Sequence, residues 1–165
     1  MKNFVAFLIL FSASALIPFN VAQATDALFT ISGVNSKGEK IEIGLTRELA
    51  TEIGLSKIHT KVLFQGEAKH SVIGVTIGTV LKKYDLVGNN LHITALDGYA
   101  IDAPRADYDT YPAMFALEID GKPLSVRERG PSWIIYPVSD FVELDNPVFE
   151  ARSVWQLASV VVNNQ

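Results

Sequence analysis

Leu-His-Ile-Thr-Ala-Leu-Asp-Gly-Tyr-Ala-Ile-Asp-Ala, residues 91–103, is the stretch of this 165-residue chain that says most about its fold. Leu91–Ala95 and Tyr99–Ala103 have the composition of strands. Between them lies Leu96-Asp97-Gly98, and an Asp-Gly pair supplies the tight turn that joins antiparallel strands. The stretch therefore predicts a hairpin. Asp120-Gly121 repeats the signal further along the chain.

Outward from this hairpin, strand patterns outnumber helix patterns. Two helices are expected, one capped by Thr46 and ending before Gly54, the other over Thr76–Tyr84. Ala106–Tyr111 is a polar connection with at most one helical turn. The remaining strands are predicted over Ala27–Val34, Lys40–Leu45, Lys57–Gln65, Ala113–Ile119, Lys122–Leu124, Ser132–Tyr136 and Leu157–Val162. The helices are not placed as repeated crossovers. The sequence therefore predicts one compact α+β domain with mixed, mostly antiparallel sheets and short helices.

The first 24 residues have the features of a secretory signal peptide. Lys2 precedes an apolar run over Phe4–Pro18, and Ala22-Gln23-Ala24 places small residues at the −3 and −1 positions of a signal peptidase site. A retained membrane anchor is the alternative, but the run is shorter than the ~20 residues that span a bilayer. We expect cleavage between Ala24 and Thr25. The domain would then comprise residues 25–165 and would be periplasmic or secreted.

Composition excludes several classes of function. The net charge is −4 and no basic run appears, so the electrostatic footprint of a nucleic-acid-binding protein is absent. There is no cysteine, which excludes a thiolate metal ligand, a cysteine nucleophile and an iron–sulfur cluster. His59, His70 and His92 are too scattered in sequence to indicate zinc. No phosphate-binding loop, nucleophile elbow or His-Glu-x-x-His motif is present.

Four short blocks carry a family resemblance. They are Gly74-Val75-Thr76-Ile77, Ala95-Leu96-Asp97-Gly98-Tyr99, Ile119-Asp120-Gly121-Lys122-Pro123-Leu124 and Ala151-Arg152-Ser153-Val154. In this order the chain resembles the molybdopterin-binding domain of the sulfite oxidase family, and Arg127–Pro137 fits the segment between the last two blocks. The resemblance covers about Ala27–Val162. It implies the α+β fold of that family and a pterin or molybdopterin-like ligand.

Two departures from the family pattern change the expected function. Catalytic members hold molybdenum through a cysteine, whereas the comparable stretch here is Val62-Leu63-Phe64-Gln65-Gly66. Neither Gln65 nor Gly66 replaces a soft thiolate, so no molybdenum is expected. Trp155 stands where the family has a lysine that binds phosphate. In lacking cysteine the chain resembles a branch of the family that looks like small periplasmic pterin-binding regulators, and the resemblance implies a membrane-bound signalling partner, notably an enzyme of cyclic di-GMP turnover.

A pterin is a flat polar ring, so its site needs planar side chains for stacking and polar groups at the ring edges. Side chains of that kind are Arg152, Ser153, Trp133, Arg127, Arg129, Tyr99, Asp97, Tyr136 and Trp155. The family motif reaches Arg152 and Ser153 directly. Trp133 is the preferred stacking residue, because Gly130-Pro131 suggests an exposed loop beside it. Trp155 leads into an apolar strand, so a core role and a site role both remain open for it.

Three functions remain open from the sequence. The leading hypothesis is a non-catalytic extracytoplasmic pterin-binding regulator. The second is a molybdopterin-dependent oxidoreductase with an atypical, cysteine-free site. The third is a structural or protein-interaction module that has lost the pocket. The polar cluster formed by Asp107, Tyr108, Asp109 and Tyr111 has no base or nucleophile beside it in sequence, so it is assigned to a surface connection.

Overall fold

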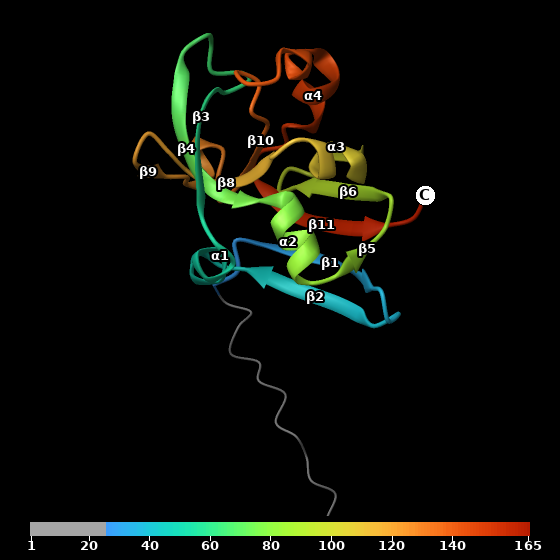
Figure 1. Cartoon of the computed structure of the whole chain (residues 1–165). Coiled ribbons are helices and arrows are strands. Elements are labelled where there is room, and N and C mark those ends of the chain that lie inside the picture. Colours follow the sequence, from blue (N-terminus) through green and yellow to red (C-terminus); the bar gives the residue numbers. More distant parts are fainter. Residues whose placement is uncertain (1–25) are drawn as a thin grey trace, which may run out of the picture.

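The computed structural model describes residues 26–165, so the predicted signal peptide lies outside the described residues (Figure 1). The strands are β1 (Phe29–Asn35), β2 (Lys40–Leu45), β3 (Ser56–Lys61), β4 (Lys69–Thr76), β5 (Leu86–Val87), β6 (Asn90–Ala95), β7 (Ala100–Pro104), β8 (Met114–Ile119), β9 (Lys122–Pro123), β10 (Trp133–Ile135) and β11 (Leu157–Asn163). The helices are α1 (Arg47–Ile53), α2 (Ile77–Lys83), α3 (Arg105–Thr110) and α4 (Pro147–Arg152), with 3-10 turns η2 (Val126–Glu128) and η3 (Val142–Leu144).

The strands form two sheets. The first has the order β2-β1-β11-β6-β7, with β5 also paired to β1, and the second has the order β10-β8-β4-β3, with β9 paired to β8. The pairing of β1 with β11 is parallel, and the other pairings within residues 26–165 are antiparallel. The prediction of an α+β fold with mixed, mostly antiparallel sheets is confirmed.

Local signals place most elements where the sequence predicts them. The hydroxyl of Thr46 accepts a hydrogen bond from the backbone N–H of Leu49 and so caps α1. The apolar face of α2 is buried through Ile77, Val80 and Leu81. The sequence does not predict the strands β4 and β5, the helix α4 or the two 3-10 turns. The strand expected to continue to residue 65 ends at Lys61, where the chain enters the β3–β4 loop.

The core has two parts. A large cluster fills the space between the first sheet, the helices and one face of the second sheet, and a smaller cluster covers the other face of the second sheet. Strand β10 contributes to both, because successive side chains of a strand alternate in direction. Trp133 packs in the smaller cluster and Tyr136, just beyond β10, in the larger. Both side chains are therefore core residues.

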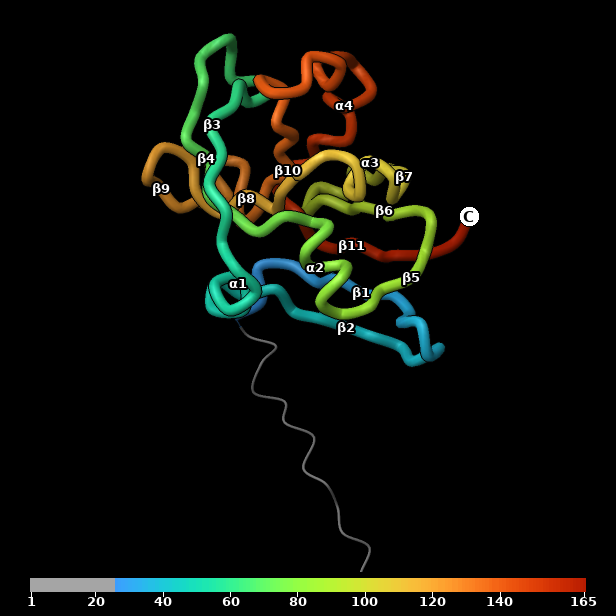
Figure 2. Tube along the Cα trace, in the orientation of Figure 1, coloured from blue at the N-terminus to red at the C-terminus, as the bar shows by residue number. Residues whose placement is uncertain are grey.

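The β3–β4 loop and α4 lie at the same end of the molecule (Figure 2). The β6–β7 turn lies beside α4, since the hydroxyl of Tyr99 donates to the carbonyl of Ala151 over 3.1 Å. Three connections that are far apart in sequence thus meet at one place. Within residues 26–165, none of the helices has the length and apolarity to cross a membrane.

Gly74 tests the packing of the second sheet. It lies where the β4–β8 register shifts, and a Cβ added there would overlap the carbonyl oxygen of Phe115. We expect Gly74→Ala to lower the free energy of unfolding by about 1–3 kcal/mol, as overpacking does. Urea denaturation measures it. Gly38→Asn is the control, since Gly38 has open space around it and asparagine tolerates its positive φ. Equal stability of Gly74→Ala and the wild type would contradict the register shift.

Candidate functional site: an aromatic pocket

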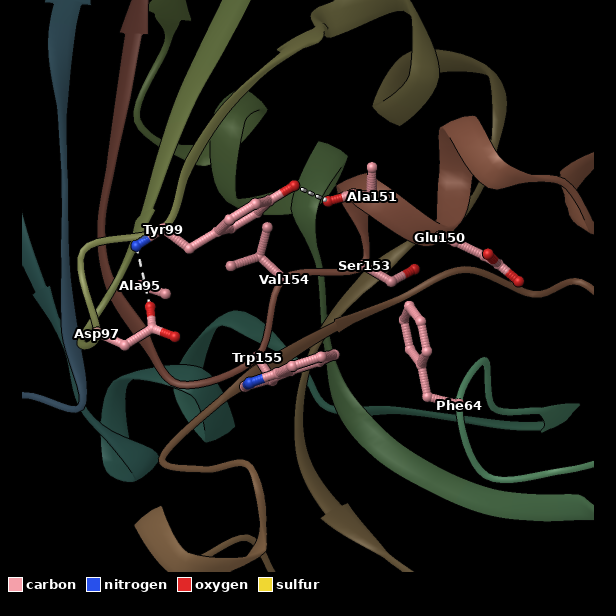
Figure 3. Close-up of a pocket in the computed structure, with 9 residues that line it drawn as sticks. All are labelled: Phe64, Ala95, Asp97, Tyr99, Glu150, Ala151, Ser153, Val154 and Trp155. Carbon is pink, nitrogen blue, oxygen red and sulfur yellow. Dashed lines mark hydrogen bonds between the residues drawn. The ribbon is translucent and has the colours of Figure 1, made fainter.

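An apolar pocket of about 240 Å³ lies where the three connections meet (Figure 3). The β6–β7 hairpin contributes Ala95, Asp97 and Tyr99, the β3–β4 loop contributes Phe64, and α4 with the segment after it contributes the rest. The lining comprises Phe64, Ala95, Asp97, Tyr99, Glu150, Ala151, Ser153, Val154 and Trp155. We call this the aromatic pocket. It brings together four of the nine residues expected from the sequence: Asp97, Tyr99, Ser153 and Trp155.

The Asp-Gly turn that predicted the hairpin also builds one wall of the pocket. The carboxylate of Asp97 accepts a hydrogen bond from the backbone N–H of Tyr99 over 2.9 Å, and Gly98 supplies the positive φ that the turn requires. Tyr99 is 45% exposed, and its hydroxyl donates a hydrogen bond to the carbonyl of Ala151 in α4. The turn is therefore fixed at both ends, while one face of the Tyr99 ring stays accessible.

Trp155 forms the opposite wall, between two other planar groups. The ring of Phe64 meets it edge-on at 5.3 Å between centroids, and the guanidinium of Arg129 lies 5.0 Å from its centroid. The same guanidinium lies 4.9 Å from the ring centroid of Trp133. Cation–π contacts of this kind hold the indole in place. In Figure 3, Asp97 and Glu150 appear on opposite sides of the pocket, with the rings of Tyr99 and Trp155 between them.

The expectation that Trp133 faces the pocket is wrong. Trp133 is fully buried, and its indole N–H donates to the backbone carbonyl of Ser153 over 3.0 Å. The backbone N–H of Ile134 donates to the carbonyl of Val154 over 2.9 Å. β10 therefore supports the pocket segment from behind. Trp155, for which the sequence leaves a core role and a site role open, is only partly buried and lines the pocket. The apolar strand begins after it, at Leu157.

Arg152 does not line the aromatic pocket either. Its Nη1 donates to the carboxylate of Asp107 over 2.8 Å, and the side chains of both residues are mostly buried. The pair joins α4 to α3. The assignment of Asp107 and Tyr108 to a surface connection is wrong, since both are buried. Burial raises the pKa of Asp107, although Arg152 acts in the opposite direction.

Ser153 lines the pocket, but its hydroxyl donates to the carbonyl of Phe149 over 2.8 Å and so finishes α4. Tyr136 lies in the core, stacked on Tyr108 at 6.0 Å between ring centroids. Burial raises the pKa of both phenols, because it disfavours the phenolate. Tyr136 is therefore a packing residue. Its expected place at the edge of a ligand is wrong.

Arg127 and Arg129 line a second, separate cavity beside the β8–β9 hairpin.

The sequence does not predict two residues whose side chains line the aromatic pocket and could contact a ligand, Phe64 and Glu150. Phe64 has a positive φ and is exposed, but in sequence it ends the apolar run Val62-Leu63-Phe64 of a predicted strand, which gives no sign that this one side chain faces a pocket. Glu150 had no signal either, since α4 itself was not predicted.

The described residues offer no thiolate of the kind that holds molybdenum in the catalytic members of the sulfite oxidase family. The chain has no cysteine, and residues 26–165 contain no group of three or more histidine, aspartate or glutamate side chains that could hold a metal ion. No family model matches the chain, and no curated protein matches it. The resemblance to the sulfite oxidase family therefore remains an expectation from the sequence.

The Arg152–Asp107 pair gives a prediction about stability. Arg152→Ala leaves a mostly buried carboxylate without its partner, so the free energy of unfolding should fall by about 1.5–3 kcal/mol. Thermal and urea denaturation of the purified domain measure the change. Arg127→Ala is the matched control, because Arg127 is exposed and its loss should cost less than about 0.5 kcal/mol.

A double variant separates the pair from the general effect of a truncation. Asp107→Asn removes the uncompensated charge, so Arg152→Ala combined with Asp107→Asn should be more stable than Arg152→Ala alone. An Arg152→Ala protein with unchanged stability and weaker pterin binding would instead show that Arg152 contacts the ligand.

Proposed function

We propose that this protein is a non-catalytic pterin-binding protein and that the aromatic pocket is its binding site. The observation that carries the proposal is the lining: three aromatic side chains, Phe64, Tyr99 and Trp155, around an apolar floor, with the carboxylates Asp97 and Glu150 at the margins. Ligand pockets are mostly apolar, with a few polar groups that orient the ligand. At about 240 Å³ the cavity is below the usual range of roughly 300–1,000 Å³, which favours a small bicyclic ring over a larger cofactor.

In this proposal the aromatic side chains stack on the pterin ring and the carboxylates bind its polar edge. Trp155 is held by Arg129, and Tyr99 by its hydrogen bond to α4, so both rings are ordered before a ligand arrives. One oxygen of Asp97 is engaged by the backbone of Tyr99. Its carboxylate still has acceptor capacity, which suits the amino-imine edge of a pterin.

The wider role rests on the sequence. The predicted signal peptide places the protein in the periplasm or outside the cell. The resemblance to cysteine-less relatives supports a regulator that senses a pterin and acts on a membrane-bound signalling protein, such as an enzyme of cyclic di-GMP turnover. A binding protein needs no reactive group in its pocket. The aromatic pocket contains two carboxylates but neither histidine nor lysine.

The two tryptophans test the pocket directly. We expect pterin to quench the emission of Trp155. Trp155→Phe should remove most of the quench and cost ~0.5–1.5 kcal/mol of binding free energy, because phenylalanine offers a smaller face. Trp133→Phe should leave the affinity nearly unchanged and lower stability by about 1–3 kcal/mol, since the carbonyl of Ser153 loses its donor.

Fluorescence titration with pterin and its dihydro and tetrahydro forms, together with thermal melts of both variants, measures these effects. The variants are matched, because each replaces one of the two indoles with the same residue. Loss of the quench in Trp133→Phe, with Trp155→Phe behaving as the wild type, would contradict the aromatic pocket as the site. Absence of pterin binding in the wild type would favour the structural or protein-interaction module.

Metal content distinguishes the binding protein from an oxidoreductase. Because no thiolate is available, protein isolated from a host that makes molybdenum cofactor should contain no stoichiometric molybdenum. Elemental analysis by mass spectrometry measures it, with a cysteine-containing sulfite oxidase-type enzyme from the same host as positive control. Close to one molybdenum per chain would overturn the proposal in favour of an oxidoreductase.

A further inference from the structure

A second cavity, of about 440 Å³, lies between η2, the β8–β9 hairpin and the start of β4. Three cationic side chains line it, Lys122, Arg127 and Arg129, together with His70. We call it the basic cavity. Its position is notable because the chain as a whole has a net charge of −4 and no basic run. Lys122, Arg127 and Arg129 come from one short segment, residues 122–129, and the fold adds His70 from the start of β4.

The two acidic side chains that line the basic cavity already have partners. Asp120 accepts a hydrogen bond from the backbone N–H of Ser71 over 2.9 Å and lies 2.7 Å from Nδ1 of His70. These contacts lower the pKa of Asp120, with the histidine contact contributing most. Glu128 accepts from the hydroxyl of Ser125 over 3.0 Å. Neither carboxylate forms an ion pair with the lysine or the arginines of the cavity.

The cations, by contrast, have donors to spare. Within residues 26–165, Lys122, Arg127 and Arg129 form no ion pair. Nη1 of Arg129 and Nε2 of His70 are buried and have no hydrogen-bond partner in the described part of the chain. Buried polar groups in folded proteins nearly always have a partner, so two orphaned nitrogens beside one cavity require an explanation. An anion in the cavity would supply an acceptor for Nη1 of Arg129. Nε2 of His70 is a donor to an anion only in the imidazolium form, because Nδ1 already faces the carboxylate of Asp120.

We propose that the basic cavity binds a small anion of the phosphate or carboxylate class. The chemistry is the same whether the anion is free or is an anionic substituent of a ligand seated in the aromatic pocket. The two cavities are neighbours: Phe64 lines one and Gln65 the other, and Arg129 of the basic cavity packs on Trp155 of the aromatic pocket. Binding of a free anion would be independent of the proposed pterin function, whereas binding of an anionic substituent rests on that function.

Arg129 provides the readout. Its guanidinium lies against the rings of both tryptophans, so an anion that pairs with it changes the electrostatic field at the two indoles of the protein. Arginine also offers two parallel donors to a phosphate or carboxylate, a geometry that lysine lacks. Binding of an anion should therefore alter the tryptophan emission in the absence of any pterin.

The first experiment titrates inorganic phosphate into the mature protein at constant ionic strength, with chloride as the replaced anion. We expect saturable binding with a change in tryptophan emission. Lys122→Gln and Arg127→Gln should each weaken it by roughly 10-fold or more, as loss of a charge-assisted hydrogen bond does. Both residues are exposed, so neither change should impair folding. Lys37→Gln, in the exposed β1–β2 turn, is the matched control and should bind phosphate as the wild type does.

The second experiment distinguishes the two sources of the anion. It compares pterin-6-carboxylate with uncharged 6-hydroxymethylpterin in the wild type and in Arg127→Gln. A preference for the carboxylate that Arg127→Gln removes, without binding of free phosphate, assigns the anion to a substituent of the ligand. Phosphate binding in a protein that binds neither pterin supports the basic cavity while refuting the pterin function. The proposal is overturned if phosphate does not bind and no carboxylate preference exists, or if neither charge-removing variant alters whichever binding is found.

Discussion

The insertion of β11 between β1 and β6 is the interaction on which the structure depends. Strand β11 is the last strand of the chain, and it pairs in parallel with β1 and antiparallel with β6. Without it the first sheet would separate into two hairpins, β1–β2 and β6–β7, each with an unpaired edge. A lone hairpin is marginally stable in water, whereas a sheet with a buried face is stable. In the first sheet, the last strand of the chain therefore holds the N-terminal hairpin and the β6–β7 hairpin together.

The entry into β11 also determines where a ligand could bind. The backbone of Gln156 donates to the carbonyl of Arg129 over 3.0 Å and accepts from the N–H of Leu96 over 2.8 Å. Trp155 is thus fixed between the β6–β7 turn and the segment after η2. The aromatic pocket lies on one side of this junction, and the basic cavity is lined by Arg129, which packs on Trp155. The proposed ligand sites and the pairing of β11 in the sheet therefore involve the same few residues, so variants here should be assessed for stability as well as affinity.

Much of the fold was accessible from local sequence signals. Some signals act over only a few residues, so the sequence alone predicts them: the Asp-Gly turns, the Thr46 cap and the apolar face of α2. The sequence does not predict the strand β4, because its apolar and polar residues do not alternate regularly. The sequence does not predict the helix α4, a single short segment that begins at the Asn146 cap and ends at Ser153. The stability of such a short helix comes mainly from its contacts with the rest of the protein.

The sequence by itself determined the residue types of the site and the turn that carries Asp97 and Tyr99. Only the tertiary structure decided which planar and cationic groups share a cavity. Trp133 and Trp155 are the same residue type, yet Trp133 is buried against the second sheet, whereas Trp155 lies at the edge of a pocket. Arg152 pairs with Asp107 because α3 and α4 pack together, over a separation of 45 residues. Which residues are buried and which side chains pair depends on contacts between distant segments, and the sequence pattern alone predicts neither.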